Sequence, residues 1–290
     1  MITRAGNGDT AQRIPEVPQT GGWDELGTRV LSSIVLGTAV IAVVYLGGLV
    51  FSAVIILVAM VMIYEWDKLC ENSWLGPIGL THTVFIGATL LFAGADMLVQ
   101  AAYSALFGML AVAAIAIYLR RPVLWPVLGV AYIAAPCVSV MVLRGQGSEG
   151  MAVVFLSFAV VWVTDSGAYL IGKSVGGPRL APRISPKKTW AGLVGGTLCG
   201  TAAGSAVALL TDLAPLGVLA ALSFGLTFAA HAGDLLESAL KRHFGAKDSS
   251  ALIPGHGGIL DRVDGLIFVW PAMVIIQFIH GGTLLPWVSR

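Results

Sequence analysis

Residues 238–264, SALKRHFGAKDSSALIPGHGGILDRVD, form a dense group of charged side chains between two long apolar runs at 216–236 and 263–285. Apolar runs of this length predict membrane spans, and charges beside a membrane are costly unless they serve a function. Cations suit phosphate groups, and closely spaced aspartates suit hard metal ions. The stretch therefore predicts phosphate chemistry at a membrane surface.

The rest of the chain has the composition of a polytopic membrane protein. Hydrophobic residues make up 57% of the 290 residues and charged residues 11%, whereas soluble domains contain about 45–50% and about 25%. We predict an all-α fold with about nine transmembrane helices, or about eight if the first division is absent, around a polar cavity that faces the cytoplasm. The expected spans are two within 30–64, divided near Gly47-Gly48, and single spans at 74–93, 97–119, 123–143, 151–171, 190–210, 216–236 and 263–285.

The basic residues predict the orientation. Most of the 17 lysines and arginines lie in alternate loops, while the opposite loops hold only Arg144. Loops rich in basic residues stay in the cytoplasm, so both polar loops of the C-terminal half are expected on that side. We divide the chain into a flexible polar cytoplasmic tail at 1–28, a transmembrane scaffold at 29–150 and a transmembrane catalytic region at 151–290.

Three aspartates are candidates for a metal centre. Asp261 and Asp264 are three residues apart, so they share one face if the segment is helical. Asp234 lies near the end of the preceding span, with Glu237 close behind it. Magnesium needs one or two carboxylates and completes its shell with water and substrate phosphates. The alternative is that these carboxylates are solvated charges or ion pairs at helix ends.

The glycines around His256 form a second element of this stretch. Gly257 and Gly258 leave backbone N–H groups free to approach a phosphate. His256 could orient a phosphate or a metal-bound water. A flexible turn after Pro254 explains the same residues without any ligand.

A second polar segment begins at Asp165, within the apolar sequence VTDSGAYLIGK, and continues to Ser185, Lys187 and Lys188 in SPKKTW. A carboxylate inside a span is costly and is expected to face the protein interior. Two lysines beside hydroxyl groups suit a nucleoside triphosphate or an anionic headgroup. The alternatives are a structural ion pair for Asp165 and contact of the lysines with anionic lipids, worth about 1 kcal/mol each. By contrast, Glu65 and Asp67 are expected in a solvated turn.

The pattern of the first stretch resembles the signature of phosphatidate cytidylyltransferases, also called CDP-diacylglycerol synthases. The resemblance rests on Ser238, Lys241-Arg242, Lys247-Asp248, Pro254, His256-Gly257-Gly258, Asp261-Arg262 and Asp264. The DSGAY and SPKKTW segments are also similar to that family. One difference is Ala191, where many relatives carry Glu or Gln.

The resemblance implies that CTP and phosphatidate give CDP-diacylglycerol and pyrophosphate, with the site on the cytoplasmic face of the bacterial plasma membrane. The expected cofactor is Mg²⁺, with a second cation left open. The expected partners are membrane lipids and the two substrates, with a homodimer left open and no nucleic acid. We assign Asp234, Asp261, Asp264 and Lys241 to catalysis, and the same three aspartates to the metal. The expected substrate-binding residues are Asp165, Ser185, Lys187, Lys188, Ser238, Arg242, Lys247, Asp248, His256, Gly257, Gly258 and Arg262.

Two other functions would use similar residues. A CTP-dependent polyprenol or lipid kinase would transfer the γ-phosphoryl group of CTP instead of the cytidylyl group. A cation-coupled transporter would also carry carboxylates in its spans, but it should show broken helices near the membrane midplane. The concentration of charge at one membrane face favours the enzyme.

Overall fold

The structure is a computed structural model that describes residues 22–280 except 71, 212, 251 and 253–256, with side chains described from residue 34 onward. Most of the predicted tail at 1–28 lies outside these residues. The helices are α1 (Gly22–Leu46), α2 (Gly48–Leu69), α3 (Pro77–Gly94), α4 (Leu98–Tyr118), α5 (Leu124–Arg144), α6 (Gly147–Val175), α7 (Trp190–Leu210), α8 (Leu216–His243), α9 (Leu260–Val263) and α10 (Leu266–Ile279), and the strands are β1 (Arg179–Ala181) and β2 (Ser185–Thr189).

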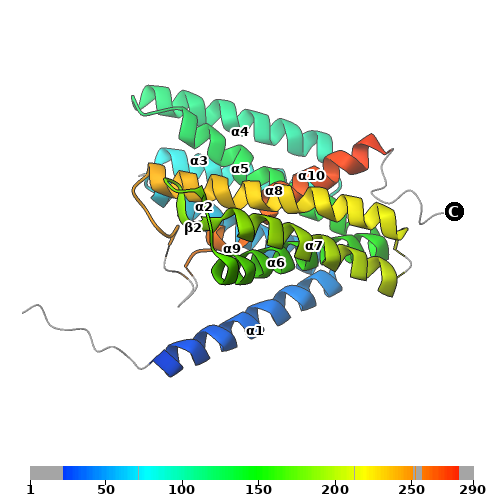
Figure 1. Ribbon diagram of the computed structural model, residues 1–290. Helices are drawn as coiled ribbons and strands as arrows, with labels where there is room; N and C mark the ends of the chain where they lie inside the picture. Colours follow the sequence, from blue (N-terminus) through cyan, green and yellow to red (C-terminus); the bar gives the residue numbers. More distant parts are fainter. Residues whose placement is uncertain (1–21, 71, 212, 251, 253–256, 281–290) are drawn as a thin grey trace, which may run out of the picture.

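Within the described residues, the helices α2 to α8 make seven elements that are long and apolar enough to cross a membrane. The apolar part of α1, Ile34–Leu46, and the helix α10 are shorter. Figure 1 shows the helices lying side by side as one bundle, from which α1 diverges. The predicted polytopic all-α fold is confirmed, whereas the number of spans stays a prediction.

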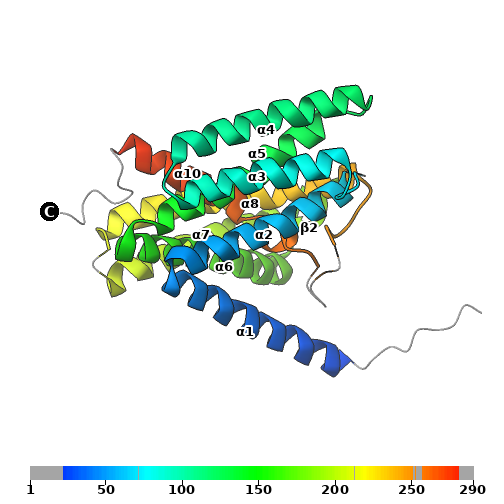
Figure 2. The same cartoon turned by 180° about the vertical axis from the view of Figure 1, so that it is seen from behind.

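The predicted division near Gly47-Gly48 is a real break between α1 and α2. Both glycines have positive φ angles, 61° and 51°, which side chains rarely adopt. Arg144 of α5 donates from Nε to the carbonyl oxygen of Val44 at 2.6 Å and from Nη2 to that of Tyr45 at 3.2 Å. The guanidinium therefore satisfies carbonyl groups that the end of α1 leaves without helical partners, and Figure 2 shows α1 meeting the bundle near this end only.

Close packing of α6, α7 and α8 depends on glycines in α7. A Cβ at Gly196 would lie 2.7 Å from the carbonyl oxygen of Thr164 in α6, and a Cβ at Gly200 would lie 2.7 Å from Cγ2 of Thr227 in α8. Small residues allow membrane helices to approach closely where the hydrophobic effect does not drive them together. This packing brings the polar ends of α6 and α8 next to each other.

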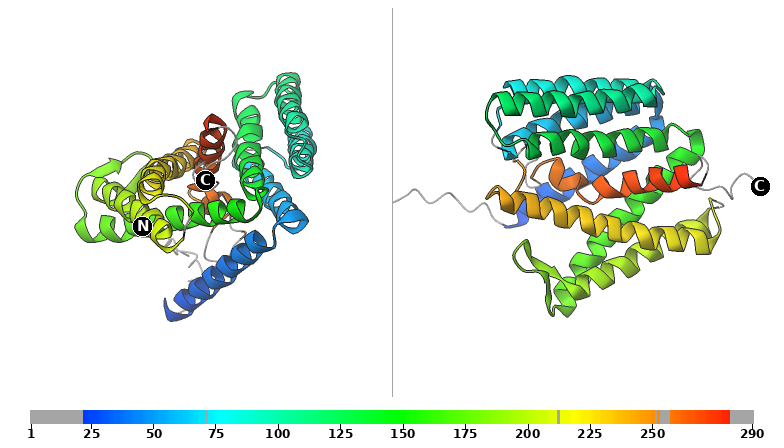
Figure 3. Two further views of the ribbon diagram at one scale, coloured as in Figure 1. Left: turned by 90° about the vertical axis from the view of Figure 1, so that its right-hand side faces the viewer. Right: turned by 90° about the horizontal axis from the view of Figure 1, so that it is seen from above.

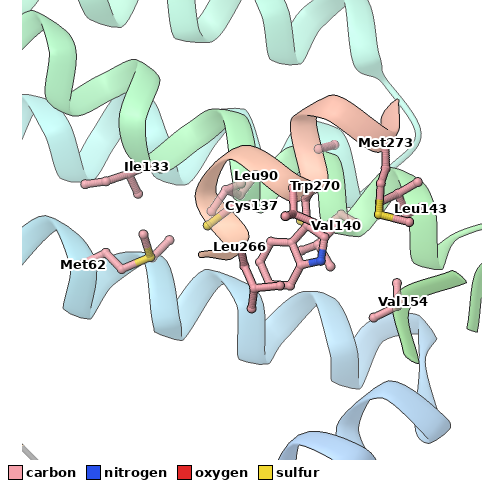
Figure 4. Close-up of a cluster of buried hydrophobic side chains, with 14 of the residues drawn as sticks. Met62, Leu90, Ile133, Cys137, Val140, Leu143, Val154, Leu266, Trp270 and Met273 are labelled. Atoms are coloured by element: carbon pink, nitrogen blue, oxygen red, sulfur yellow. The ribbon is translucent and has the colours of Figure 1, made fainter. Parts of the chain in front are cut away.

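The apolar core joins α10 to helices of the N-terminal half. Figure 4 shows Met62 of α2, Leu90 of α3 and Cys137 of α5 around Leu266 and Trp270 of α10. Trp270 also donates from its indole nitrogen to the Ser157 hydroxyl of α6 at 3.0 Å. The residues predicted as scaffold and as catalytic region thus share one core.

In the described residues, the last predicted span, 263–285, begins at the final residue of α9 and continues mainly as α10. The helix α9 ends at Val263 and α10 begins at Leu266, with Asp264 and Gly265 between them. Asp264 keeps helical dihedral angles, φ −50° and ψ −46°. The carbonyl oxygen of Asp264 lies so close to Gly233 that a Cβ there would overlap with it. Figure 3 shows α10 running beside α5 and α8, on which it packs.

Candidate active site

The two polar segments meet at one end of the bundle. Figures 1 and 2 place the β1–β2 hairpin and the segment after α8 at this end. Lys188 of β2 forms an ion pair with Asp234 of α8, with Nζ and Oδ2 2.5 Å apart. Arg242 donates from Nε to the carbonyl oxygen of Ile184 at 3.4 Å. Residues that are far apart in the sequence therefore form one site.

A polar pocket of about 670 Å³ lies between α6, the hairpin, α7 and α8. Five predicted site residues line it, and four of them carry a charge. Asp165 lines the pocket, so its exposed carboxylate faces the space between the helices. These predicted residues are Asp165, Ser185, Lys187, Lys188 and Asp234. The lining also contains two cations that were not predicted as site residues, Lys173 and Arg179.

The hairpin is held in place by the start of α7. Thr189 accepts a hydrogen bond from the N–H of Gly192 on its hydroxyl at 3.0 Å, so it caps the helix. Because neighbouring residues of a strand point to opposite sides, Lys188 turns inward to Asp234 while Lys187 stays exposed. A Cβ at Gly172 of α6 would lie 3.2 Å from Cα of Gly192, so the two helices touch at the floor of the pocket.

Lys241 of α8 connects two carboxylates beside this pocket. Its Nζ donates to Oε2 of Glu237 at 2.7 Å and to Oδ1 of Asp261 at 2.6 Å. All three side chains are at least 88% buried, since their exposed fractions are 12%, 3% and 9%. Removing one partner of such a buried pair costs about 3–5 kcal/mol because it leaves a charge uncompensated. Lys241 therefore stabilises the junction of α8 and α9.

Asp261 also accepts hydrogen bonds from the segment that follows α8. Its Oδ2 accepts from the Ser249 N–H at 3.1 Å, from the Ser249 hydroxyl at 3.0 Å and from the Gly258 N–H at 2.9 Å. Burial raises the pKa of Asp261, but the hydrogen bonds from Lys241 and Gly258 outweigh it and lower the pKa to about 2. The carboxylate is therefore charged at neutral pH and can hold both Lys241 and the loop.

The glycines near Asp261 shape this loop. Gly257 has a φ of 81°, and a Cβ there would lie 2.8 Å from Oδ2 of Asp261. The sequence predicts that the N–H groups of this turn approach a phosphate, but in the structure the N–H of Gly258 donates to Asp261. The predicted residue His256 lies outside the described residues, so its role stays a prediction.

Glu65 and Asp67 are buried, so the expectation that they lie in a solvated turn is wrong. The helix α2 continues to Leu69 and carries both side chains into the protein, where each is 0% exposed. Asp67 contacts Nδ1 of His82 at 3.0 Å, and Nε2 of His82 contacts the carbonyl oxygen of Pro126 at 2.8 Å. The signal that could have identified them is a pair of carboxylates at the end of an apolar helix.

The remaining predicted residues lie around the site without lining the polar pocket. Ser238 is half-buried in α8, and Lys247 and Asp248 are exposed in the turn after it. Arg242 donates to the carbonyl oxygen of Ala246 at 3.0 Å and thereby closes that turn. Arg262 is exposed on α9 and attracts Asp165 electrostatically.

The aspartates near the polar pocket provide carboxylate oxygens, which are the ligands that a hard cation such as Mg²⁺ prefers. Asp165, Asp234 and Asp264 come from three elements and lie close enough to repel one another. In the described part of the chain, no group of three His, Cys, Asp or Glu side chains is arranged as a complete metal site. Magnesium does not need one, because it uses few carboxylates together with water and phosphate oxygens. The oxygens of Asp261 already accept protein hydrogen bonds.

An apolar pocket of about 740 Å³ lies on another side of α8, between α5, α8 and α10. Leu236, Leu240 and Phe268 contribute to its lining. Tyr132 of α5 lies in the same lining, and its buried hydroxyl has no hydrogen-bond partner among the described residues. This hydroxyl is within electrostatic range of Glu237, Asp261 and Asp264. The apolar pocket therefore borders a carboxylate cluster that consists of Glu237, Asp261 and Asp264.

Comparison with known proteins places this arrangement in a family. The model of the "Cytidylyltransferase family" matches residues 27–280. The phosphatidate cytidylyltransferases of Brucella suis biovar 1 (strain 1330) and Brucella abortus (strain 2308) are each 40% identical over 257 residues, which cover 83% of this chain and 89% of the relative. The phosphatidate cytidylyltransferase of Staphylococcus aureus (strain COL) is 44% identical over 130 residues, which cover 44% of this chain and 50% of the relative. The chain therefore belongs to the cytidylyltransferase family.

Proposed function

We infer that this protein is a membrane-embedded nucleotidyltransferase that makes CDP-diacylglycerol and pyrophosphate from CTP and phosphatidate. The family membership supports this activity, since the relatives described above are named phosphatidate cytidylyltransferases. The observation that carries it is the polar pocket between α6, the hairpin, α7 and α8. Its four cations are Lys173, Arg179, Lys187 and Lys188, which match a triphosphate in charge.

The reaction needs little covalent help from the protein. A phosphate oxygen of phosphatidate attacks the α-phosphorus of CTP, and the bond from that phosphorus to the bridging oxygen of the β-phosphate breaks. The electron pair of this bond leaves with pyrophosphate. Phosphatidate is already an anion at neutral pH, so no strong base is required. The task of the protein is to bring two anions together and to stabilise the leaving group.

The basic residues of the hairpin perform this task in our proposal. Lys187 is exposed at the pocket, so it is free to bind the triphosphate. Lys188 is paired with Asp234 and orients that carboxylate. Bound magnesium would neutralise the leaving pyrophosphate, and Asp234 and Asp264 would hold it. Asp261 would support them by holding Lys241 and the loop.

We further propose that the apolar pocket receives an acyl chain of phosphatidate. It is lined by aliphatic and aromatic side chains and borders the carboxylate cluster at Tyr132. The helix α8 contributes to both pockets, with Asp234 in the polar one and Leu236 and Leu240 in the apolar one. The nucleotide and the lipid would then approach the reacting phosphates from different sides of this helix.

In this proposal the protein spans the bacterial plasma membrane, and the end of the bundle that carries the polar pocket faces the cytoplasm. The hairpin and the segment after α8 carry lysines and arginines, whereas Arg144 lies at the opposite end of the bundle. Such a bias is typical of cytoplasmic loops, and CTP is a cytoplasmic nucleotide.

The position of the transferred phosphorus tests the reaction. Purified protein with phosphatidate, magnesium and CTP labelled at the α-phosphate should yield labelled lipid, because the cytidylyl group carries that atom. Label at the γ-phosphate should appear in pyrophosphate. Both products are separated by thin-layer chromatography. Transfer of the γ-label to the lipid would contradict the proposal and support a lipid kinase.

The variant Asp264→Asn tests the proposed cation site. Asparagine keeps the shape but removes the charge that a hard cation needs, so kcat should fall by about 100-fold or more. The magnesium concentration for half-maximal activity should rise. Glu149→Gln, an exposed carboxylate in the first turn of α6, is the matched control and should behave like the wild type. Wild-type turnover of a monodisperse Asp264→Asn variant would exclude this role.

The variant Ala135→Trp tests the acyl-chain pocket. Ala135 lines this pocket and is exposed, so an indole would fill space without disturbing the core. KM for phosphatidate with long acyl chains should rise by about 10-fold, while KM for CTP and for dihexanoyl phosphatidate should change little. Ala114→Trp, on the exposed side of α4, serves as the control. An equal effect of both variants on long-chain and short-chain lipids would contradict the pocket assignment.

Labelling of single cysteines tests the orientation. In a background without the three native cysteines, Ser174→Cys at the end of α6 should resist a membrane-impermeant maleimide in intact cells. Ser148→Cys at the start of α6 should react, since both positions are exposed and lie at opposite ends of that helix. Mass shifts on gels report the labelling before and after cell lysis. The reverse pattern would overturn the cytoplasmic placement.

A further inference from the structure

Glu65 of α2 lies at the centre of a network that holds Ser249 and Ser250 together with the start of α9. Its side chain is 0% exposed. The oxygen Oε1 accepts from the Ser250 hydroxyl at 2.6 Å and from the Ile259 N–H at 2.9 Å. The oxygen Oε2 accepts from the Leu260 N–H at 2.8 Å and from the Ser249 hydroxyl at 3.2 Å. One carboxylate from the N-terminal half thus joins the serines that follow α8 to the residues that begin α9.

The network leads directly to Asp261 and Lys241. The Ser249 hydroxyl lies between the two carboxylates, 3.2 Å from Oε2 of Glu65 and 3.0 Å from Oδ2 of Asp261, which share its single hydrogen. Asp261 in turn accepts from Lys241 at 2.6 Å. Glu65 is therefore separated from Asp261 by a single side chain. It does not line the polar pocket, so it acts through other residues.

The loop backbone is pressed against this carboxylate. Gly258 is buried, and a Cβ there would overlap with the side chains of Ser249 and Glu65. Because the N–H groups of Ile259 and Leu260 begin the short helix α9, Glu65 also orients the helix that carries Asp261. A buried acceptor with this many donors holds Ser249, Ser250, Ile259 and Leu260 firmly in place.

We propose that Glu65 is a positioning residue for nucleotidyl transfer, which holds Ser249, Ser250 and the start of α9 and thereby fixes the geometry of Asp261 and Lys241. This inference rests on the proposed function. It makes α2 part of the active-site apparatus, although this helix lies in the region predicted as scaffold. The carboxylate is required because both of its oxygens accept backbone N–H groups, whereas an amide offers only one acceptor oxygen.

The test compares Glu65→Gln with Asp67→Asn. Both variants replace a fully buried carboxylate near the end of α2 by its amide, but Asp67 contacts His82 and not the loop. Glu65→Gln should lower kcat by about 10-fold to 100-fold, with a smaller change in KM for CTP. Glu65→Asp, which keeps both acceptor oxygens, should recover part of the lost kcat. Asp67→Asn should keep most of its activity.

Hydrogen exchange of the protein without substrate provides a readout that does not depend on the reaction. Amides of 257–261 should exchange faster in Glu65→Gln, while those of α3 and α4 keep their wild-type rates. Ser250→Ala removes one neutral donor and should produce a smaller change in the same segment, which keeps the test valid if Glu65→Gln does not fold.

Two results would overturn the inference. The first is wild-type exchange and wild-type kcat in the Glu65→Gln and Ser250→Ala variants. The second is an equal loss of kcat in Asp67→Asn and Glu65→Gln with uniformly faster exchange, which indicates general destabilisation. A wild-type protein that makes no CDP-diacylglycerol would instead refute the proposed function, while the exchange data would still report on the loop.

Discussion

Compensation of buried charge governs the active end of this protein. A chain with 57% hydrophobic residues can bury charged groups only where each has a partner. Lys241 meets this requirement between Glu237 and Asp261, and Asp261 adds hydrogen bonds from Ser249 and Gly258. The end of α8, the helix α9 and the described residues Ser249 and Gly258 are therefore held together by one connected group of polar contacts.

The helix α8 organises the site because different faces of it serve different chemistry. Asp234 contributes to the polar pocket and pairs with Lys188 of the hairpin, while Leu236 and Leu240 line the apolar pocket. A helix turns by about 100° per residue, so neighbouring residues reach separate spaces. This arrangement suits a reaction between a charged nucleotide and a lipid, since each substrate needs a different environment around one reacting centre.

The N-terminal helices contribute more than a membrane scaffold. Glu65 of α2 supports the loop before α9, and α2, α3 and α5 share the apolar core with α10. At the other end, Arg144 of α5 caps α1 through the carbonyl groups of Val44 and Tyr45. Each end of the bundle thus uses a charged side chain to satisfy backbone groups that regular helices leave unpaired.

The class of fold and many of the charged residues around the site are evident from the sequence alone, although Glu65, Lys173 and Arg179 are not. Apolar runs of helical length predict membrane helices because the bilayer leaves backbone groups no other partners, and the break at Gly47-Gly48 was visible as a pair of glycines. The charged stretch after α8 and the pair Lys187-Lys188 stood out because charges are rare in such a chain.

Which of these groups contact one another depends on the packing of the helices. Glu65 lies far from Leu260 in the sequence, and its role depends on how α2 packs beside the loop. In the same way, the N–H of Gly258 is directed to Asp261 by the fold of the turn and not by its glycine content. The physical reason is that hydropathy depends on composition over a window, whereas hydrogen bonds depend on distances of about 3 Å, which only the packed chain defines.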